Sequence, residues 1–402
     1  MINDEETGRN YPREVEEEHY TVTWKPQGKY LFYFTPDKPQ GKEKPALMIS
    51  KGIYSRLESF GATEDLVLVR GDSTSTNTGP EGGAIHYLEQ LLGHKVHWDI
   101  CLIHINELPL KHMMIKLDGK YIPIGKLLQK INQLQRSSTF PALADTNEIK
   151  EMPPEIVQTL STDQKNSYNL IPPVDQGKLD DQLAKIICGE RITARLCTIG
   201  EALLMLWMSD HGLTGETLRI LEVLVRFTIN VYFKLYFDIK AKHSIKDAPL
   251  HLVHMLELLA QQSAEVKAVV TEVIVRGAYS THSENLLTSL LCSVDQEDRK
   301  FAVNKILEVR CGQEEGDMSV RIRRNPTINL AASKPIELID WRSATVLEPV
   351  FTCKMTISVT ESLVDHPLDI DPYSTHTQSC ERAVQEVSKA MASVYGEDRR
   401  DG

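Results

Sequence analysis

Apolar and polar positions follow two different periods along the first part of the chain. Alternation with a period of two, which is typical of half-buried strands, repeatedly gives way to the spacing of three and four that is typical of amphipathic helices. The elements predicted in this way are, in order, strand, strand, helix, strand, helix, strand and helix: residues 20–24, 30–34, 45–60, 66–69, 82–92, 96–103 and 106–114. The first two strands are joined by a short turn, which predicts an antiparallel hairpin, whereas the later strands are separated by helices and should be parallel. The pattern therefore predicts an α/β fold with a mixed sheet.

The rest of the chain has a different pattern. Prolines among polar residues between 140 and 178 predict a linker with one short helix near residues 155–160. From 180 to 310, apolar stripes at helical spacing predict an all-helical block, and a last helix is expected near residues 378–394. We therefore divide the chain into an N-terminal α/β part, a linker, a helical block, a mixed segment and a closing helix: residues 1–139, 140–179, 180–318, 319–372 and 373–402.

Composition and charge narrow the classes of protein to consider. The 402 residues are 41% hydrophobic and 25% charged, which is ordinary for a globular protein. The chain has neither an apolar run of membrane-spanning length nor a signal-peptide pattern at its start, so we expect an intracellular protein without a membrane partner. Its seven cysteines are scattered and include no C-x-x-C pair, which predicts free thiols.

The net charge of −11 argues against a surface that is basic all over, because sequence-independent binding of nucleic acid depends on Lys and Arg that neutralise phosphates. Any contact with DNA should therefore be local. The densest basic cluster, which contains Arg321, Arg323 and Arg324, is the candidate for such a contact. Alternatively, this cluster lies on an exposed edge strand, where charged side chains prevent pairing with another chain.

The most informative local feature is the turn at residues 71–79, which closes the apolar run at 66–69. It places Asp72 at the end of a predicted buried strand, in a stretch of small residues that leads into a helix. Ligands on open α/β sheets gather beyond the carboxyl ends of strands, so Asp72 is a candidate contact for a metal ion or a phosphate. The same residue types also suit a purely structural turn, in which Asp and Ser bond backbone N–H groups.

Several separated segments together resemble the catalytic core of hAT-superfamily transposases. They are the turn at Asp72, the Cys101-Leu102-Ile103-His104 segment followed by Asn106, and the Ser379-Cys380-Glu381-Arg382 segment. More closely, the chain resembles transposon-derived proteins of invertebrate genomes, which carry segments like Asn77-Thr78-Gly79-x-x-Gly82-Gly83. The resemblance implies a ribonuclease-H-like domain with a large helical insertion, after which the closing helix returns to the core. Residence in the nucleus is implied by the resemblance alone.

The resemblance also implies a chemistry. Such transposases cut DNA with three carboxylates that hold two divalent ions. Two ions roughly 3.5–4 Å apart stabilise the attacking and leaving oxygens of a phosphoryl displacement, and Mg²⁺ or Mn²⁺ takes oxygen ligands. By the resemblance, Asp72 corresponds to the second acid and Glu381 to the third. The alternative for Glu381 is an exposed side chain near a helix N-terminus, where the helix dipole favours it.

Two departures from the family pattern bear on activity. The first acid should lie on a central first strand, but residues 1–18 are polar and charged, so that strand is expected to be missing and the sheet incomplete. Asp37, after the hairpin, is a weak substitute. Family members also tend to carry an Arg-Trp pair at the start of the insertion, where this chain has Arg195 and Leu196, and nearby Trp207 is expected in the core. Both departures predict impaired DNA cleavage.

Three functional hypotheses follow. The first is a transposon-derived protein that is catalytically incapacitated but retains nucleic-acid or protein binding. The second is an active transposase or nuclease, dependent on Mg²⁺ or Mn²⁺, whose first strand lies upstream of this reading frame. The third is a helical protein-interaction module. The partners considered are DNA and a second copy of the chain.

A zinc site is a minor alternative at the same segments. Cys101 and His104, together with His376 and Cys380, have the ligand types that tetrahedral zinc accepts. The two pairs are separated by most of the chain, and a single thiol or imidazole at a strand end is usually satisfied within the protein.

Overall fold

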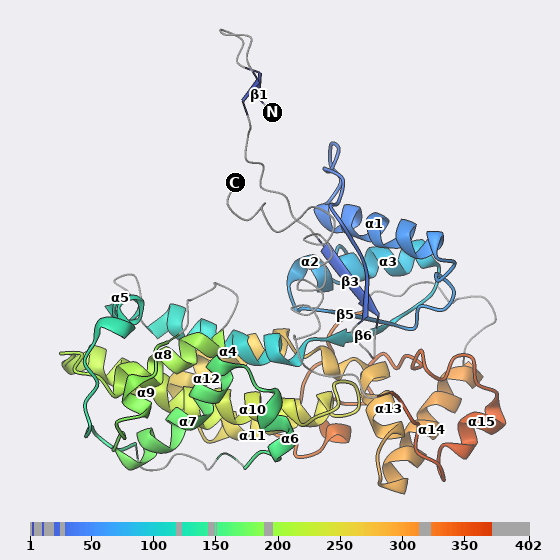
Figure 1. The fold of residues 1–402 in the computed structure, drawn as a ribbon. Helices are drawn as coiled ribbons and strands as arrows, with labels where there is room; N and C mark the ends of the chain where they lie inside the picture. The colour runs from blue at the N-terminus through green and yellow to red at the C-terminus, as the bar shows by residue number, and fades with distance from the viewer. Residues whose placement is uncertain are drawn as a thin grey trace. The chain divides into compact units, whose positions relative to one another are not determined.

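The fold is described from a computed structural model of the chain. The structure describes residues 2–3, 10–11, 20–24, 29–117, 123–143, 149, 151–188, 196–312 and 323–371. These residues fall into two compact units, one of residues before 67 together with 74–94, and one of residues 67–73 together with 95–371. Both are drawn in Figure 1. The described residues are mixed α/β and mostly helical, which confirms the fold class in its coarse form.

The first unit holds short antiparallel strand pairs and three helices. Its elements are β1 (Ile2–Asn3), β2 (Asn10–Tyr11), β3 (Tyr20–Trp24), β4 (Lys29–Phe34), α1 (Pro45–Ser59), α2 (Ser75–Thr78) and α3 (Ala84–Leu92). Strand β3 pairs with β4 in the predicted antiparallel hairpin, with Tyr20 opposite Phe34, and β1 pairs with β2. Gly93, at a φ of 73°, ends α3 in the left-handed conformation that its position after the helix predicts.

Apolar side chains of the hairpin and of α1 and α3 form the core of this unit. The Ser50 hydroxyl on α1 donates to the carbonyl oxygen of Ala84 at 2.6 Å, which ties α1 to α3. Helix α1 also lies close to the Phe34 ring, since a Cβ added at Gly52 would be 2.3 Å from a ring carbon. The buried members of the core are Phe32, Phe34, Ala46, Ile49 and Ala84.

The second unit contains a parallel strand pair. Strand β5 (Leu68–Gly71) pairs with β6 (His97–Ile100), with Leu68 opposite His97 and Gly71 opposite Ile100. Strand β5 overlaps the predicted run at 66–69 but begins two residues later and is half-buried, not buried as predicted. Strand β6 is shorter than expected, because α4 begins at Leu102. All four residues of β6 are buried.

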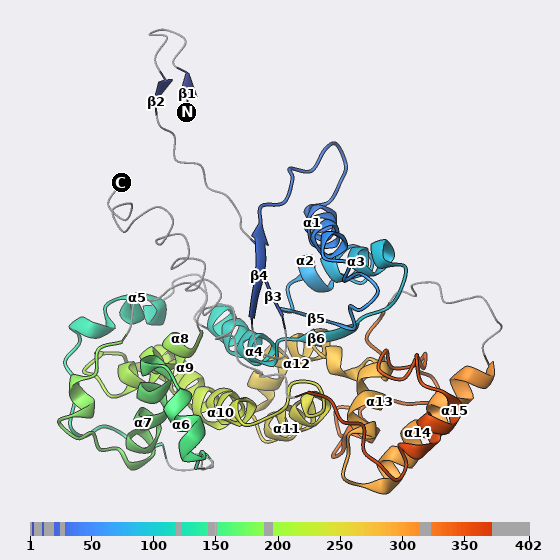
Figure 2. The same cartoon turned by 45° about the vertical axis from the view of Figure 1, so that its right-hand side comes forward.

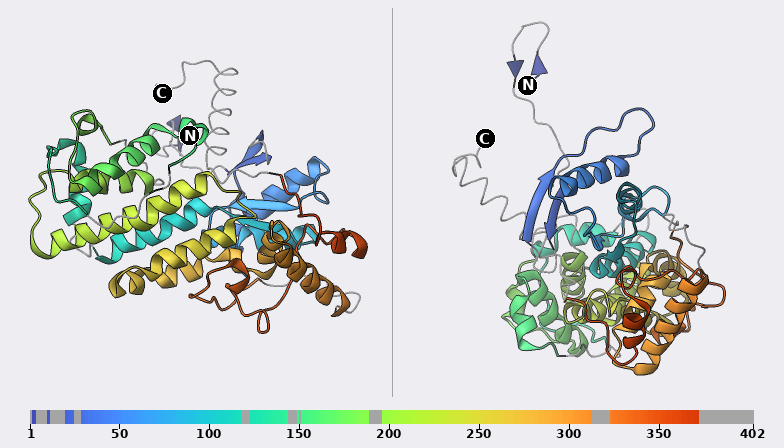
Figure 3. Two further views of the ribbon diagram at one scale, coloured as in Figure 1. Left: turned by 90° about the horizontal axis from the view of Figure 1, so that it is seen from below. Right: turned by 90° about the vertical axis from the view of Figure 1, so that its right-hand side faces the viewer.

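The rest of the second unit is built from helices, which Figure 2 and Figure 3 show packed beside one another. The first helices are α4 (Leu102–Leu117), α5 (Pro123–Gln129), α6 (Pro154–Thr159), α7 (Thr162–Gln176), α8 (Leu196–Trp207) and α9 (Gly215–Phe227). They are followed by the π-helix η3 (Thr228–Phe233), α10 (Lys234–Lys240), α11 (Ala248–Ala260), α12 (Ala264–Arg276), α13 (Ser283–Leu291), α14 (Gln296–Gly312) and α15 (Ile357–Ser362). Short 3₁₀ turns are η1 (Ile131–Gln133), η2 (Leu183–Lys185), η4 (Tyr279–Thr281) and η5 (Pro335–Glu337). None of the described helices is both long and apolar enough to cross a bilayer.

One helix differs from the sequence prediction. Helix α7 occupies fifteen residues in the segment that we predicted as a linker, and it contains Pro172 and Pro173. Ser161 and Gln164 form a capping box that starts the helix, which satisfies backbone donors of its first turn. Leu170 and Val174 are fully buried, and α7 packs against α8. Tertiary packing therefore maintains a helix that the prolines argue against.

Aromatic side chains fill the centre of the helical part. Phe227, Tyr232, Phe233 and Phe237 are among its largest fully buried side chains. Gly200 on α8 is required by this packing, because an added Cβ would lie 2.7 Å from the Phe233 ring. The segment at 323–371 contains η5 and α15, with Leu363 buried in a second apolar cluster against α13 and α14.

Candidate site at the ends of the parallel strands

The carboxyl ends of β5 and β6 lie side by side because the two strands are parallel. The backbone N–H of Cys101 donates to the Gly71 carbonyl oxygen at 2.9 Å, so the pairing continues one residue past the strands. Asp72 directly follows β5, and Cys101 leads directly into α4. The structure thus brings Asp72 and Cys101 to the same edge of the strand pair.

His104, in the first turn of α4, joins Asp72 at this edge. Burial lowers the pKa of His104 below its ordinary value, and the negative charge of Asp72 opposes that shift. The thiol of Cys101 has a raised pKa, first because of burial, while the positive charge of Arg70 opposes the rise. The Asp72 carboxylate, the His104 imidazole and the Cys101 thiol are therefore polar groups that these strand ends bring together.

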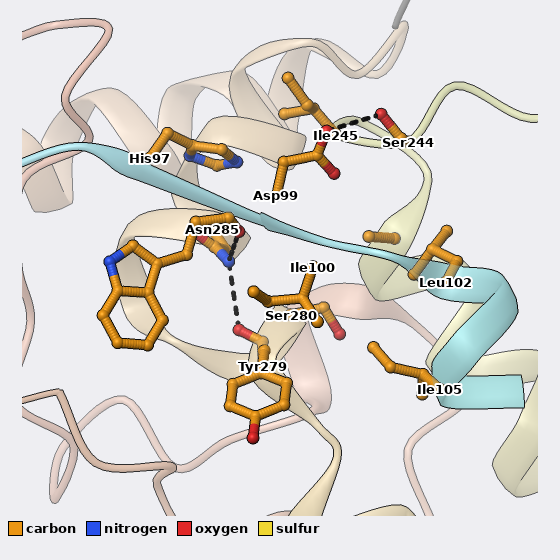
Figure 4. A pocket seen from close by; sticks show the side chains of 12 residues that line it. His97, Asp99, Ile100, Leu102, Ile105, Ser244, Ile245, Tyr279, Ser280 and Asn285 are labelled. Carbon is orange, nitrogen blue, oxygen red and sulfur yellow. Dashed lines mark hydrogen bonds between the residues drawn. The ribbon is translucent and has the colours of Figure 1, made fainter. Parts of the chain in front are cut away.

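Asp99 is the second carboxylate of the strand pair, and it is neutralised within the fold. It lies directly opposite Arg70 in the strand register, and its Oδ2 accepts a hydrogen bond from Arg70 Nε at 2.7 Å. Ser244 Oγ donates to the same oxygen at 3.2 Å, a contact drawn in Figure 4. The Asp99 side chain is only 2% exposed. Its charge therefore holds the two strands together and does not accompany Asp72 at the strand ends.

A pocket lies beside β6, between the strand, the loop at 244–248 and the segment from η4 to α13 (Figure 4). Asn285 donates from Nδ2 to the carbonyl oxygens of Tyr279 at 3.1 Å and of Trp98 at 3.4 Å, which covers an edge of β6. Within the described part of the chain, Asn285 Oδ1 and His97 Nδ1 are buried without a hydrogen-bond partner. Burial lowers the pKa of His97 to about 4, so its imidazole is neutral at physiological pH. Two unpartnered polar atoms therefore lie among the residues that line the pocket.

Asn106, which the resemblance singled out, has a structural contact. It is buried on α4, and its Nδ2 donates to the Tyr232 carbonyl oxygen in the π-helix at 3.0 Å. A π-helical turn changes the backbone hydrogen-bond pattern, and Asn106 bonds one of its carbonyls. Asn106 thus fixes α4 to η3.

Arg323 corrects the prediction of a basic nucleic-acid contact. Its guanidinium is paired with the Glu284 carboxylate, donates to the Val96 carbonyl oxygen at 2.9 Å and lies 4.9 Å from the centre of the Trp98 ring. Burial would raise the pKa of Glu284, but Arg323 outweighs that effect and the pKa is about 2. Arg323 is therefore neither a surface contact nor part of a solvated edge strand, because it compensates a buried carboxylate. The next residue, Arg324, is exposed.

Several predicted residues lie outside the described ranges. They include the proposed third acid Glu381 and its neighbour Arg382, the zinc candidates His376 and Cys380, and the basic residues Arg195 and Arg321. Within the described ranges, no group of three or more His, Cys, Asp or Glu side chains is placed to hold a metal ion. Trp207 is buried and donates from Nε1 to the Pro141 carbonyl oxygen at 3.0 Å, which confirms it as a core residue.

Three enclosed titratable side chains of the helical part were not predicted from the sequence. Burial raises the pKa of Glu107 on α4 and of Glu201 on α8 to about 7, and it lowers the pKa of Lys240 on α10 to about 8. Lys240 Nζ is enclosed without a hydrogen-bond partner in the described part of the chain and lies 5.1 Å from the centre of the Tyr236 ring. The available signal was Glu201, a carboxylate directly before the apolar stretch 202–207.

Comparison of the chain with known protein families, with curated proteins and with solved structures finds no significant match.

Proposed function

We propose that the chain is a transposon-derived protein, with a core of ribonuclease-H-like type, that binds DNA and does not cut it. The order of its elements supports the proposal: an antiparallel hairpin, a helix, a strand, helices, a parallel strand and a helix. This order is the one that the resemblance to hAT-superfamily transposases implies after the first strand of the core.

The observation that carries the proposal is where the two carboxylates of the parallel strand pair lie. Asp72 lies at the strand ends beside His104, whereas Asp99 is buried in an ion pair with Arg70. A two-ion site needs several carboxylate oxygens directed at one place. The described strands supply Asp72 alone to that place, which favours binding without cleavage.

The test is a plasmid-nicking and DNA-binding assay on the full chain, with Mg²⁺ or Mn²⁺ present. We expect no cleavage above that of the Asp72→Ala variant, and we expect retention of DNA that weakens as salt is raised. Asp65→Ala is the matched control, because Asp65 is exposed and precedes the same strand. Metal-dependent nicking by the wild type that Asp72→Ala abolishes and Asp65→Ala preserves would overturn the proposal.

The second candidate is an active metal-dependent transposase or nuclease. The placement of Asp72 beside His104 at the strand ends favours it, because reactive groups on α/β folds gather there. In this case Glu381, the third acid by resemblance, should be as indispensable as Asp72. Full nicking activity in either Asp72→Ala or Glu381→Ala would eliminate this candidate.

A further inference from the structure

The second half of α4 exposes basic side chains along one face. Lys111, His112, Ile115 and Lys116 recur at the spacing of a single helical stripe, and the side chains of Lys111, Ile115 and Lys116 are exposed. The Ile115 residue is 61% exposed, although it is apolar. The opposite side of the helix, which includes Leu110 and Met113, is buried in the core.

Arg276, in the last turn of α12, adds a further cation beside this stripe. Helices α4 and α12 pack against each other, as Figures 1 and 2 show. The pKa of His112 is lowered first by its partial burial and then by the positive charges of Arg276, Lys111 and Lys116, while Glu272 opposes the shift. Four basic side chains from two helices therefore lie within electrostatic range of one another. We call Lys111, His112, Lys116 and Arg276 the basic face.

The cations of the basic face form no close ion pair with a described carboxylate. This holds for Lys111, Lys116 and Arg276, although the charge of Glu107 reaches Lys111 and that of Glu272 reaches His112. Exposed Arg219, in comparison, is paired with Glu265 at 2.8 Å. Permanent positive charge thus remains available on the basic face.

Exposed Arg324 lies near the end of α12. The amide of the next residue, Asn325, donates to the carbonyl oxygens of Val275 at 3.4 Å and Arg276 at 3.3 Å. Two members of the predicted basic cluster therefore differ in exposure. Arg323 is buried, whereas Arg324 is exposed and precedes Asn325, which bonds the end of α12.

We propose that the basic face binds the phosphate backbone of DNA. The proposal rests on the proposed function and names the surface that would perform it. A chain with a net charge of −11 repels a polyanion over most of its surface, so a local concentration of unneutralised cations is where DNA can approach. Lys side chains act as point charges toward phosphate, and contacts of this kind require no particular base sequence.

The test measures the affinity of a fluorescently labelled DNA duplex for the full chain over a series of salt concentrations. The variant Lys111→Gln/Lys116→Gln/Arg276→Gln removes three charges from the basic face. The control Lys300→Gln/Lys334→Gln/Arg342→Gln removes three exposed charges elsewhere in the same unit, so both proteins have the same net charge. Circular dichroism and urea unfolding establish that both variants are folded. The double variant Lys111→Gln/Lys116→Gln, which changes α4 alone, serves if the triple variant does not fold.

We expect the basic-face variant to bind DNA at least about tenfold more weakly near physiological salt, with the control close to the wild type. The slope of log K against log salt should fall by roughly two to three, because each neutralised phosphate contributes about 0.9. Equal weakening of both variants would overturn the basic face as the binding surface while DNA binding itself stands. A wild type that shows no salt-dependent binding would instead overturn the proposed function.

Discussion

Arg323 and Glu284 form an ion pair in which both side chains are almost entirely enclosed, with 2% and 3% of their surfaces exposed. The pair joins the segment after α14 to the first turn of α13, and the Arg323 guanidinium also bonds the Val96 carbonyl oxygen just before β6. Three segments that are distant in the sequence therefore meet at one charge pair. The free energy of this arrangement depends on both partners being present.

Removing one partner of this pair should destabilise the second unit strongly. We expect Arg323→Met to lower the free energy of unfolding by about 3–5 kcal/mol, because it leaves the Glu284 carboxylate buried and uncompensated. Changing both residues to Met should recover a substantial part of the loss. Urea unfolding measures the effect. The control is Arg342→Met, since Arg342 is 93% exposed in its pair with Asp340 and should change stability by less than about 1 kcal/mol. Equal losses for the two single variants would contradict this account.

Asp99 should behave as a structural residue of the strand pair. Asp99→Asn removes the charge that faces Arg70 across β5 and β6, and we expect a loss of about 2–4 kcal/mol, somewhat below that of a fully enclosed pair because Arg70 is 16% exposed. Asp65→Asn, at an exposed position before β5, is the control and should be nearly neutral. Thermal and urea unfolding report the difference. A stable Asp99→Asn protein would show that Asp99 is free for another function.

Gly83 should tolerate no side chain. A Cβ at this position would lie 2.4 Å from the Gly79 nitrogen and 2.6 Å from the Asn77 carbonyl oxygen, both backbone atoms that cannot rotate away. We expect Gly83→Ala to cost about 2 kcal/mol or more, through overpacking of the turn before α3. Gly312→Ala is the control, because no atom of the described residues lies within 4 Å of the added Cβ. Urea unfolding of the full chain is measured for both variants, and protease resistance of residues 74–94 locates the effect of Gly83→Ala. The prediction fails if both alanine variants unfold alike.

Stability should depend on pH through Glu107 and Glu201. Burial raises their folded pKa to about 7, above the ordinary value of 4.5, so the folded state retains protons that the unfolded state releases. Their contribution to stability is therefore full below about pH 4.5 and is lost as pH rises toward 7. Glu201→Gln should flatten this slope, and exposed Glu361→Gln should leave it unchanged. Urea unfolding between pH 5 and pH 8 measures the slopes, and an undiminished slope in Glu201→Gln would contradict the assignment.

Much of the secondary structure was predictable because its signals are local. The hairpin of β3 and β4, the parallel character of β5 and β6, and the helices between residues 196 and 312 follow from the spacing of apolar residues and from turn residues such as Gly93. Helix α7 was not predictable in the same way. Its prolines argue against a helix, and burial of Leu170 and Val174 against α8 overrides that local signal.

The sequence by itself predicted that Asp72 follows one strand and that another strand ends just before His104, whereas the parallel register that brings these ends together is seen in the structure. Only the tertiary structure decided which charges are buried. Arg323 pairs with Glu284, 39 positions away, and bonds Val96, 227 positions away, so no local pattern distinguishes it from exposed Arg324. The physical reason is that desolvation and Coulomb compensation depend on neighbours in space, whereas hydrophobic periodicity depends on neighbours along the chain.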